Sequence, residues 1–230
     1  MGIVSFSLWG NNDVYNLGML ENALMIPKLY PDFKVWIYIG NTVQKKILKV
    51  LQKMKHVRII KKNEDDSMAN SLWRFEPAFI TDEIVLVRDA DSRISKRETL
   101  AVSEWLASDS DFHIMRDHPT GHSFKIMAGM WGCRNGILKS LVDKYRTFAP
   151  YNCLGIDQHF LAEFIYDSVV EKAYIHDNYF KYETNIHSFT ETDETSFVGE
   201  IILEAPLAIE YLKLKPEEYL DLVKYSSDGF

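Results

Sequence analysis

The stretch IVLVRDADSR, residues 84–93, joins an aliphatic run directly to a dense group of charges. The run from Ile84 to Val87 has the length and composition of a buried strand. Two bases and two acids follow it within six positions, namely Arg88, Asp89, Asp91 and Arg93. In open α/β sheets, ligands bind at the carboxyl ends of the strands. The stretch therefore predicts a buried strand that ends in a polar site.

The overall composition is that of a globular domain of enzyme size. The chain has 230 residues, and 47% of them are hydrophobic, which is enough for a sizeable core. Its 26 basic and 33 acidic residues give a net charge of −7. A broad nucleic-acid-binding surface needs a basic face, so we expect no nucleic-acid partner.

The cysteines and the amino terminus indicate the compartment. Cys133 and Cys153 lack metal-ligand spacing, and two thiols in a chain of this length are typically free in a reducing compartment. The start, MGIVSFSLWGNN, has no basic region of a signal peptide and is typical of a first strand. No apolar run approaches the roughly 20 residues that span a bilayer. We expect a cytoplasmic protein without a transmembrane segment.

Strand patterns alternate with helix patterns along the chain. Strands are expected over residues 3–8, 33–39, 57–60, 84–87, 112–115 and 169–175. Helices are expected over residues 17–25, 43–54, 67–79, 96–107, 137–145 and 158–166. Ser95 and Glu98 fit a capping box at the start of the fourth helix. The alternation predicts an α/β fold with a largely parallel central sheet flanked by helices.

Two further segments leave alternatives open. The helix over residues 43–54 carries a row of lysines, which attracts anions or, more simply, forms a solvated face. Residues 204–230 stand apart, with apolar residues at helical spacing and Pro216 opening a helix. We expect 1–203 to form the main domain and 204–230 a helical extension packed on it, rather than a join to another domain or subunit. The sequence does not indicate the oligomeric state.

Asp89 and Asp91 have the spacing of a DxD motif on a turn between a strand and a capped helix. Two such carboxylates can reach one hard cation, and Mg²⁺ or Mn²⁺ sites are commonly completed by substrate phosphates. Arg88 and Arg93 can add charge-assisted contacts to a diphosphate. The simpler interpretation is an exposed acidic turn paired with its own arginines. Its position after a strand favours the metal site.

Five segments together resemble a known family. They are SLWRFEPAF (71–79), IVLVRDADSRI (84–94), HIMRDHP (113–119), GMWG (129–132) and GIDQHFL (155–161). In this order they resemble GT-A-fold glycosyltransferases, specifically a DxD-containing group of bacteria and large DNA viruses. The resemblance runs from about residue 3 to about residue 199. It implies a single GT-A-like domain, a nucleotide-sugar donor, Mn²⁺ or Mg²⁺, and a glycan or glycoprotein acceptor.

The resemblance also implies roles on the donor side. Asp91 is the expected direct metal ligand, and Asp89 is oriented toward the metal or the ribose. The residues expected to bind the donor are Ser5, Phe6, Ser7, Leu8, Arg74, Arg88, Asp89, Arg93 and Gln158. For Arg74 the alternative is that it caps a carboxylate between core aromatics. A histidine from the C-terminal part is expected on the metal, His176 ahead of His187.

On the acceptor side the expected contacts are Gly129, Met130, Trp131, Gly132 and His118. Glycines let a backbone approach a ligand closely, and Trp131 either stacks on a sugar or belongs to the core. Asp157 and Gln158 resemble the DQ element near the donor sugar, and Asp157 is also a good helix cap.

The resemblance indicates transfer of a hexosyl or deoxyhexosyl group, from UDP before GDP. An inverting reaction needs a base, for which Asp117 or Asp157 is the candidate. A retaining reaction needs no such base.

Two alternative functions stay open. One is a magnesium-dependent phosphatase or phosphotransferase of the haloacid-dehalogenase type, in which the first aspartate is the nucleophile. The other is a catalytically silent carbohydrate-binding module.

Overall fold

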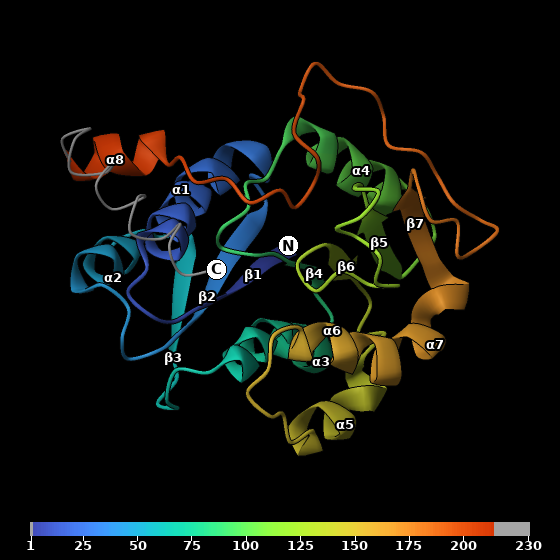
Figure 1. Ribbon diagram of the computed structural model, residues 1–230, viewed down its shortest axis with the longest axis horizontal. Coiled ribbons are helices and arrows are strands. Elements are labelled where there is room, and N and C mark those ends of the chain that lie inside the picture. Colours follow the sequence, from blue (N-terminus) through green and yellow to red (C-terminus); the bar gives the residue numbers. More distant parts are fainter. Residues whose placement is uncertain (1, 214–230) are drawn as a thin grey trace.

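The computed structural model of the protein describes residues 2–213. It has three layers, with a seven-stranded sheet between two layers of helices (Figure 1). The strands are β1 (Gly2–Leu8), β2 (Phe33–Ile39), β3 (Val57–Lys61), β4 (Ile84–Val87), β5 (Phe112–Arg116), β6 (Trp131–Cys133) and β7 (Ala173–Asp177). Their spatial order is β3-β2-β1-β4-β6-β5-β7. The largely parallel α/β sheet predicted from the sequence is confirmed.

One strand runs against the others. β6 pairs antiparallel with both β4 and β5, whereas β1 pairs parallel with β2 and β4. No strand was expected in this part of the sequence, but Trp131 to Cys133 form this short strand. Because β6 lies between β4 and β5, β5 is two places from β4 in the sheet, and β7 is three places from it.

The first helix layer covers one face of the sheet. It contains α1 (Asp13–Leu29), α2 (Lys45–Leu51), α4 (Lys96–Ala107) and α8 (Pro206–Leu212). Alternate residues of β1 and β2, such as Phe6 and Ile37, pack against these helices in one fully buried cluster. The period of two in a strand sends their neighbours to the other face.

The second layer covers that other face. It contains the 3₁₀ helix η1 (Met68–Phe75), α3 (Glu76–Ile80), α5 (Val142–Thr147), α6 (Ile156–Phe160) and α7 (Tyr166–Val169). Shorter pieces complete it, namely the 3₁₀ turns η2 (Lys139–Leu141) and η4 (Val170–Lys172) and the π-helical turn η3 (Leu161–Ile165). Phe75, Phe79 and Phe160 fill the core beneath this layer.

Local chemistry explains where helices begin and change. Ser95 Oγ accepts the Glu98 N–H at 3.1 Å, so the predicted cap of α4 is confirmed. The helix expected over 67–79 is instead a 3₁₀ turn followed by α3. Ser71 Oγ donates to the Met68 carbonyl at 2.8 Å, and Pro77 lies at the start of α3, where its missing N–H costs nothing. The strand expected at 169 begins only at Ala173, after α7 and η4.

The C-terminal segment packs on the first layer as far as the structure describes it. Ala205 and Ala208 are buried with α1, and the Glu21 carboxylate accepts the N–H groups of Leu207 and Ala208 at 3.2 and 2.6 Å. The helix expected from Pro216 lies outside the described residues.

Within 2–213, no helix combines the length and the apolarity that crossing a membrane requires. Cys133 and Cys153 are both free, as expected.

Candidate active site

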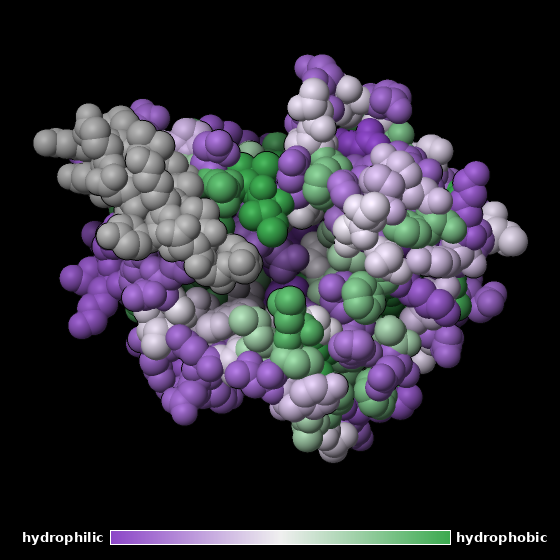
Figure 2. Space-filling view, viewed as in Figure 1, coloured by the Kyte–Doolittle hydropathy of each residue, from purple (hydrophilic) through white to green (hydrophobic). Residues whose placement is uncertain are grey.

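The sheet changes direction beside its central strand. From β1 the chain moves outward through β2 and β3 and then returns to β4 on the other side of β1. Such a reversal opens a crevice at the carboxyl ends of the two inner strands. The Arg88 N–H donates to the Ser5 carbonyl at 3.1 Å, and the acidic turn follows immediately. Figure 2 shows the face of the molecule hollowed near its middle, between the two helix layers.

Arg74 joins two of the predicted carboxylates at this crevice. Its Nη2 lies 2.9 Å from Asp89 Oδ1 and 3.0 Å from Asp157 Oδ2. Arg74 and Asp157 are buried, whereas the Asp89 side chain is 41% exposed. Three residues from η1, the β4 turn and α6 thus meet at one point. The structure therefore brings Arg74, Asp89 and Asp157 together.

The position of Arg74 follows from the local fold of η1. Ser67 caps this turn by accepting the Ala69 N–H, and the Arg74 N–H donates to Ser7 Oγ at 2.9 Å. Ser7 donates in turn to the Ser71 carbonyl. Both contacts hold η1 against the end of β1. The guanidinium consequently points to the crevice instead of to solvent.

The position of the Asp89 carboxylate requires a glycine at residue 129. A Cβ built on Gly129 would overlap the Asp89 carboxylate. Any side chain at this position would displace the carboxylate from its place beside Arg74. The predicted closeness of Gly129 to the site is thus explained by packing against the acidic turn.

Asp91 is almost fully buried at 9% exposure, and its environment disfavours the charged form. Burial raises the pKa of Asp91 to about 6, and the neighbouring Asp89 charge contributes to the rise. The backbone N–H of Asp91, Arg74 and Arg93 act in the opposite direction. Partial burial and then Asp157 also raise the pKa of Asp89, against the lowering effect of Arg74. The turn therefore holds two carboxylates whose charges are not fully compensated.

Tyr15 lies close enough to Asp89 and Asp91 to interact with their charges, and it was not expected from the sequence. It lies in the first turn of α1, the helix that follows β1. Burial first, and then the charges of Asp91 and Asp89, raise the pKa of Tyr15 to about 12. The phenol consequently stays protonated and available as a donor. The start of a helix after the central strand was the one sequence signal for it.

The donor set at the turn suits a hard divalent cation. Oxygen ligands from one or two carboxylates, with the rest supplied by phosphates and water, are what Mg²⁺ and Mn²⁺ prefer. A cation would also compensate the charge that raises the pKa of Asp91. Within residues 2–213, no group of three or more His, Cys, Asp or Glu side chains is gathered to hold a metal without such help. Asp89 and Asp91 therefore fit a metal that a diphosphate shares.

Arg88 does not face the crevice. Its Nε donates to Glu98 Oε1 at 2.6 Å, and Nη1 donates to the carbonyls of Val87 and Trp131 at 2.7 and 2.8 Å. Both partners of this ion pair are 2% exposed. The expectation of a diphosphate contact is wrong for this residue, because its guanidinium is turned inward to tie α4 to β4 and β6.

Arg93 is also turned inward. Its Nη1 donates to the carbonyls of Ala90 and Ser92, and its Nη2 donates to those of Ile202 and Glu204, all at 2.9–3.2 Å. The Ile202 N–H donates to the Asp91 carbonyl at 2.9 Å. Arg93 therefore fastens the segment before α8 to the acidic turn. It holds the turn in shape rather than presenting its guanidinium to a donor.

The residues of β6 belong to the core and not to a sugar site. Trp131 is fully buried, stacks on Phe112 at 5.3 Å between ring centroids, and donates its indole N–H to the Ala128 carbonyl. Met130 is 3% exposed, and Gly132 is buried against β4. The expected acceptor contacts of Trp131 and Gly132 are not supported, because β6 is covered on both faces, and Met130, which precedes β6, is buried as well.

His176 lies away from the acidic turn. Its Nδ1 is 2.9 Å from His113 Nε2, and its Nε2 is 3.0 Å from Glu104 Oε2. The ring is fully buried in β7, which β6 and β5 separate from β4. Neither ring nitrogen is available to a metal held by Asp91. His187, the second choice, stacks on Tyr174 at 3.9 Å beside β7 and is equally remote in the sheet order.

Asp117 and His118 are engaged by neighbouring loops. Asp117 accepts two bonds from Arg97 at 2.7 and 2.8 Å and a third from the Val198 N–H at 3.0 Å. A carboxylate with these contacts is a poor base for an acceptor hydroxyl. His118 Nδ1 accepts the Gly121 N–H at 2.9 Å, and its ring contacts Phe197. These contacts close the loop after β5.

The side chains of the donor residues expected on β1 and α6 point in different directions. The side chains of Phe6 and Leu8 lie in the core of the first face, so only their main chain can contact a donor. Ser5 Oγ is buried and finds no hydrogen-bond partner among residues 2–213. Gln158 Oε1 is likewise buried without a partner in that range. Asp157 Oδ1 accepts the Gln158 N–H at 2.9 Å.

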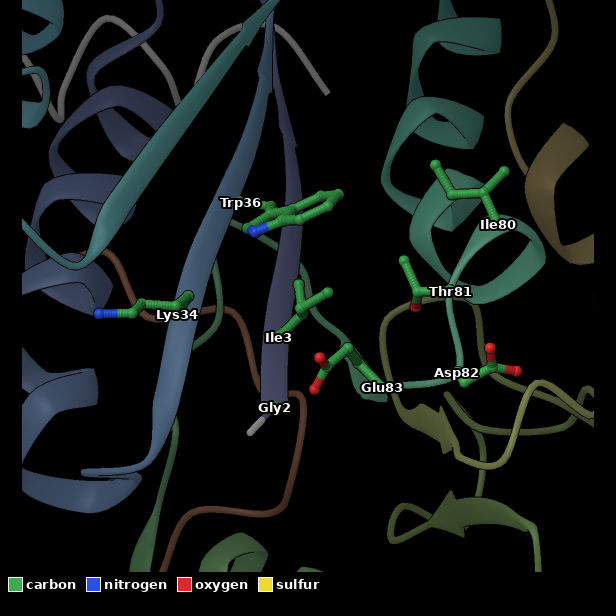
Figure 3. A pocket seen from close by; sticks show the side chains of 8 residues that line it. All are labelled: Gly2, Ile3, Lys34, Trp36, Ile80, Thr81, Asp82 and Glu83. Carbon is green, nitrogen blue, oxygen red and sulfur yellow. The ribbon is translucent and has the colours of Figure 1, made fainter.

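A separate cavity of about 580 Å³ lies at the opposite, amino edge of the sheet (Figure 3). Ile3 and Trp36 face Ile80 and Thr81 across it. One face of Trp36 is covered by the Arg58 guanidinium at 4.2 Å. The cavity contains none of the residues that meet at Arg74. The carboxyl edge therefore remains the candidate site.

Comparison with solved structures places the fold. A mannosyltransferase from Pyrobaculum calidifontis, PcManGT, in complex with GDP-Man and Mn²⁺, matches 97% of this chain and 72% of its own, with a TM-score of 0.52 and 12% identity. Residues 1–349 of S. aureus TarS, in complex with UDP-GlcNAc, match 97% and 70%, with a TM-score of 0.53 and 11% identity. No protein-family model and no curated protein sequence matches the chain. These similarities confirm the predicted GT-A-like fold.

Proposed function

We propose that the chain is a metal-dependent glycosyltransferase. It moves a sugar from a nucleoside-diphosphate sugar, UDP before GDP, to a hydroxyl of a glycan or glycoprotein. The observation that carries this proposal is the meeting of Asp89, Arg74 and Asp157 beside Asp91 at the switch point of a GT-A-like sheet. The complexes of PcManGT with GDP-Man and of TarS with UDP-GlcNAc support the class of donor.

Asp89 and Asp91 hold Mn²⁺ or Mg²⁺ in this proposal. When bound, the ion neutralises the charge that develops on the leaving diphosphate. Arg74 keeps Asp89 oriented, and Gly129 leaves room for its carboxylate. The main-chain bond from Ile202 to Asp91 and the four bonds from Arg93 keep the turn in one shape. The chain thus contributes a preorganised pair of ligands.

Asp157 and Gln158 face the donor sugar in this arrangement. Buried polar atoms without partners are rare in folded proteins, and the free Gln158 Oε1 is of the kind that a sugar hydroxyl satisfies. Asp157 is held by Arg74 and by its own helix start, which fixes its orientation. In an inverting reaction Asp157 is the base, since Asp117 is bound by Arg97 and Val198.

The phosphatase alternative is not favoured. A phosphatase of that type uses the first aspartate of the motif as a nucleophile, but here Asp89 is ion-paired with Arg74 at 2.9 Å. The motif also follows the fourth strand of the chain, whereas in that class it normally follows the first. The silent binding module remains as an outcome of the experiment below.

A thermal-shift screen tests the proposal. UDP, GDP, CMP and dTDP sugars are added to the wild type with and without Mn²⁺, and the same screen is run on Asp91→Ala and on the exposed control Asp109→Ala. We expect one nucleotide diphosphate to stabilise the wild type and the control only with Mn²⁺, and to leave Asp91→Ala unchanged.

The same samples separate the alternatives. Slow hydrolysis of the stabilising nucleotide sugar with Mn²⁺ supports a transferase. Binding without hydrolysis across the panel supports a silent module. Hydrolysis of simple phosphate esters that is lost in Asp89→Asn, with no nucleotide sugar bound, supports the phosphatase. An unchanged response of Asp91→Ala contradicts the proposed site.

A further inference from the structure

The charges of the chain are strongly segregated along the sequence. Residues 33–63 contain nine Lys and Arg residues and no Asp or Glu. The rest of the chain therefore carries 17 basic and all 33 acidic residues. A protein with a net charge of −7 thus contains one segment with a local charge of +9.

The fold gathers part of this segment on one flank. The residues 33–63 form β2, α2 and the edge strand β3. α2 buries Ile47 and Leu51 against the core and turns its lysines outward. Figure 2 shows hydrophilic side chains over α2 and beside β3. We name the exposed lysines of this side the basic flank, which consists of Lys45, Lys46, Lys49, Lys53, Lys55 and Lys61.

The basic flank is not neutralised by the described part of the chain. None of the six side-chain ammonium groups makes a hydrogen bond or ion pair within residues 2–213. Two of the other three bases of the segment have partners, since Lys62 lies 3.5 Å from Glu76 and Arg58 lies over Trp36, and the third, Lys34, lines the cavity at the amino edge of the sheet. Charged residues on an edge strand also prevent strand pairing between molecules. That explanation accounts for Lys61 but not for the row on α2.

We propose that the basic flank docks the protein on an anionic lipid bilayer. Clusters of four to eight Lys or Arg residues on a surface helix are typical of such docking, and each residue near the membrane strengthens binding about fivefold. Three of the six lysines lie on α2, and the other three lie on the segment that follows it, as far as β3. All six residues are Lys, whose compact ammonium suits diffuse surface charge. Nucleic-acid recognition favours Arg forks and stacking aromatics, and none of the exposed aromatic residues within 2–213 lies on the flank.

Two acidic side chains lie beside the start of α2, where Asp13 accepts a hydrogen bond from Gln44 at 2.6 Å and Asp66 accepts one from Thr42 at 2.7 Å. Neither is paired with a lysine of the flank within residues 2–213. The screening length is about 10 Å at moderate salt, so charges on the far side of the molecule act weakly on a membrane at the flank. No large hydrophobic residue of residues 33–63 is exposed for insertion. Binding is therefore electrostatic and reversible, and it weakens steeply as the salt concentration rises.

Co-sedimentation of the full chain with vesicles tests this inference. Vesicles of phosphatidylglycerol mixed with phosphatidylcholine are compared with pure phosphatidylcholine, at about 0.05 and 0.5 M salt. We expect binding only to the anionic vesicles and only at the lower salt concentration. Lys45→Glu/Lys49→Glu/Lys53→Glu should lower the partition coefficient about 100-fold.

A matched variant controls for net charge. Lys144→Glu/Arg146→Glu/Lys172→Glu changes the total charge equally on exposed residues of the opposite helix layer. It should bind vesicles within a few-fold of wild type, and thermal unfolding of both variants should match wild type. Equal losses in the two variants, or equal binding to neutral vesicles, overturn the inference.

Competition with duplex DNA separates the other class of partner. We expect excess DNA to leave the vesicle-bound fraction unchanged. Displacement from the vesicles by DNA would assign the flank to nucleic acid and overturn the inference. These outcomes do not affect the proposed transferase, since that is assayed without membranes.

Discussion

Two buried carboxylates in this protein meet opposite electrostatic environments. Asp177, at the end of β7, pairs with Arg116 at 2.7 Å and accepts the N–H groups of Tyr179 and Phe180 at 2.7 and 2.9 Å. Burial alone would raise its pKa, but these bonds lower it below the ordinary value. Burial raises the pKa of Asp91, at the end of the β4 turn, to about 6.

The difference separates a structural site from a site built for a ligand. Every oxygen of Asp177 has a donor, so the site is satisfied by the chain itself. Asp91 lies beside another carboxylate and is only partly compensated by Arg74 and Arg93. Perturbed groups of the second kind are typical of functional sites, where a substrate or ion completes the balance.

The largest loss of stability is expected from a change at the structural site around Asp177. Arg116→Met leaves the buried Asp177 and the neighbouring Glu183 without their shared partner. Removal of one partner from a buried ion pair costs about 3–5 kcal/mol. Urea unfolding should show a loss of that size in the free energy of unfolding. A loss below about 1 kcal/mol would mean that the cluster is not the anchor of β7.

The same change of Asp to Asn should act in opposite directions at the two sites. At neutral pH, Asp91→Asn removes a disfavoured charge and should stabilise the metal-free protein by about 1–3 kcal/mol. Asp177→Asn should destabilise it. The gain in Asp91→Asn should fade as the pH falls from about 6 to about 4, because wild-type Asp91 then takes up its proton. Unfolding curves at several pH values check this, and destabilisation by both variants would contradict the comparison.

Metal affinity should follow the protonation of Asp91. A ligand carboxylate must be ionised, so protons compete with Mn²⁺ below the pKa of about 6. With nucleotide present, the Mn²⁺ affinity should fall about tenfold per pH unit below that value and level off above it. Titration at several pH values measures the profile. A flat profile between pH 5 and 7, within about a factor of two, would remove Asp91 from the ligands.

The smallest effect is expected at the residue that fastens the turn. Arg93→Lys keeps the charge but loses the fork that bonds the carbonyls of Ile202 and Glu204, and it should cost about 1 kcal/mol. Mn²⁺ affinity should fall as well. Arg134→Lys is the matched control, because Arg134 also bonds carbonyls, those of Leu106 and Ser108, away from the turn. An equal effect of both variants on Mn²⁺ affinity would refute the positioning role.

The sequence predicted best the site residues that directly follow the end of a strand. The aliphatic run before Asp89, the Ser95 cap and the LWRF segment with Arg74 each marked a piece of the same crevice. Parallel strands bring such ends to one edge of the sheet, so their meeting could be anticipated. The placement of Asp89 rests on this rule, whereas Arg74 and Asp157, on η1 and α6, were expected from the family resemblance.

The failures have a different physical origin. The residue pattern of a strand does not indicate its position in the sheet. Because the antiparallel β6 lies between β4 and β5, His176 lies far from Asp91. The direction of an arginine side chain cannot be predicted from the sequence either. Arg88 and Arg93 donate to carbonyls and to Glu98 inside the protein instead of to a ligand. Trp131 became core because its short strand is covered on both faces.

Electron paramagnetic resonance of Mn²⁺ offers the most direct test of the metal and diphosphate site. Mn²⁺ is titrated into wild type and Asp91→Asn with UDP and, in parallel, with GDP. The account predicts one bound Mn²⁺ per wild-type chain with one of the two nucleotides and none in the variant. Equal Mn²⁺ binding by Asp91→Asn and wild type would contradict it.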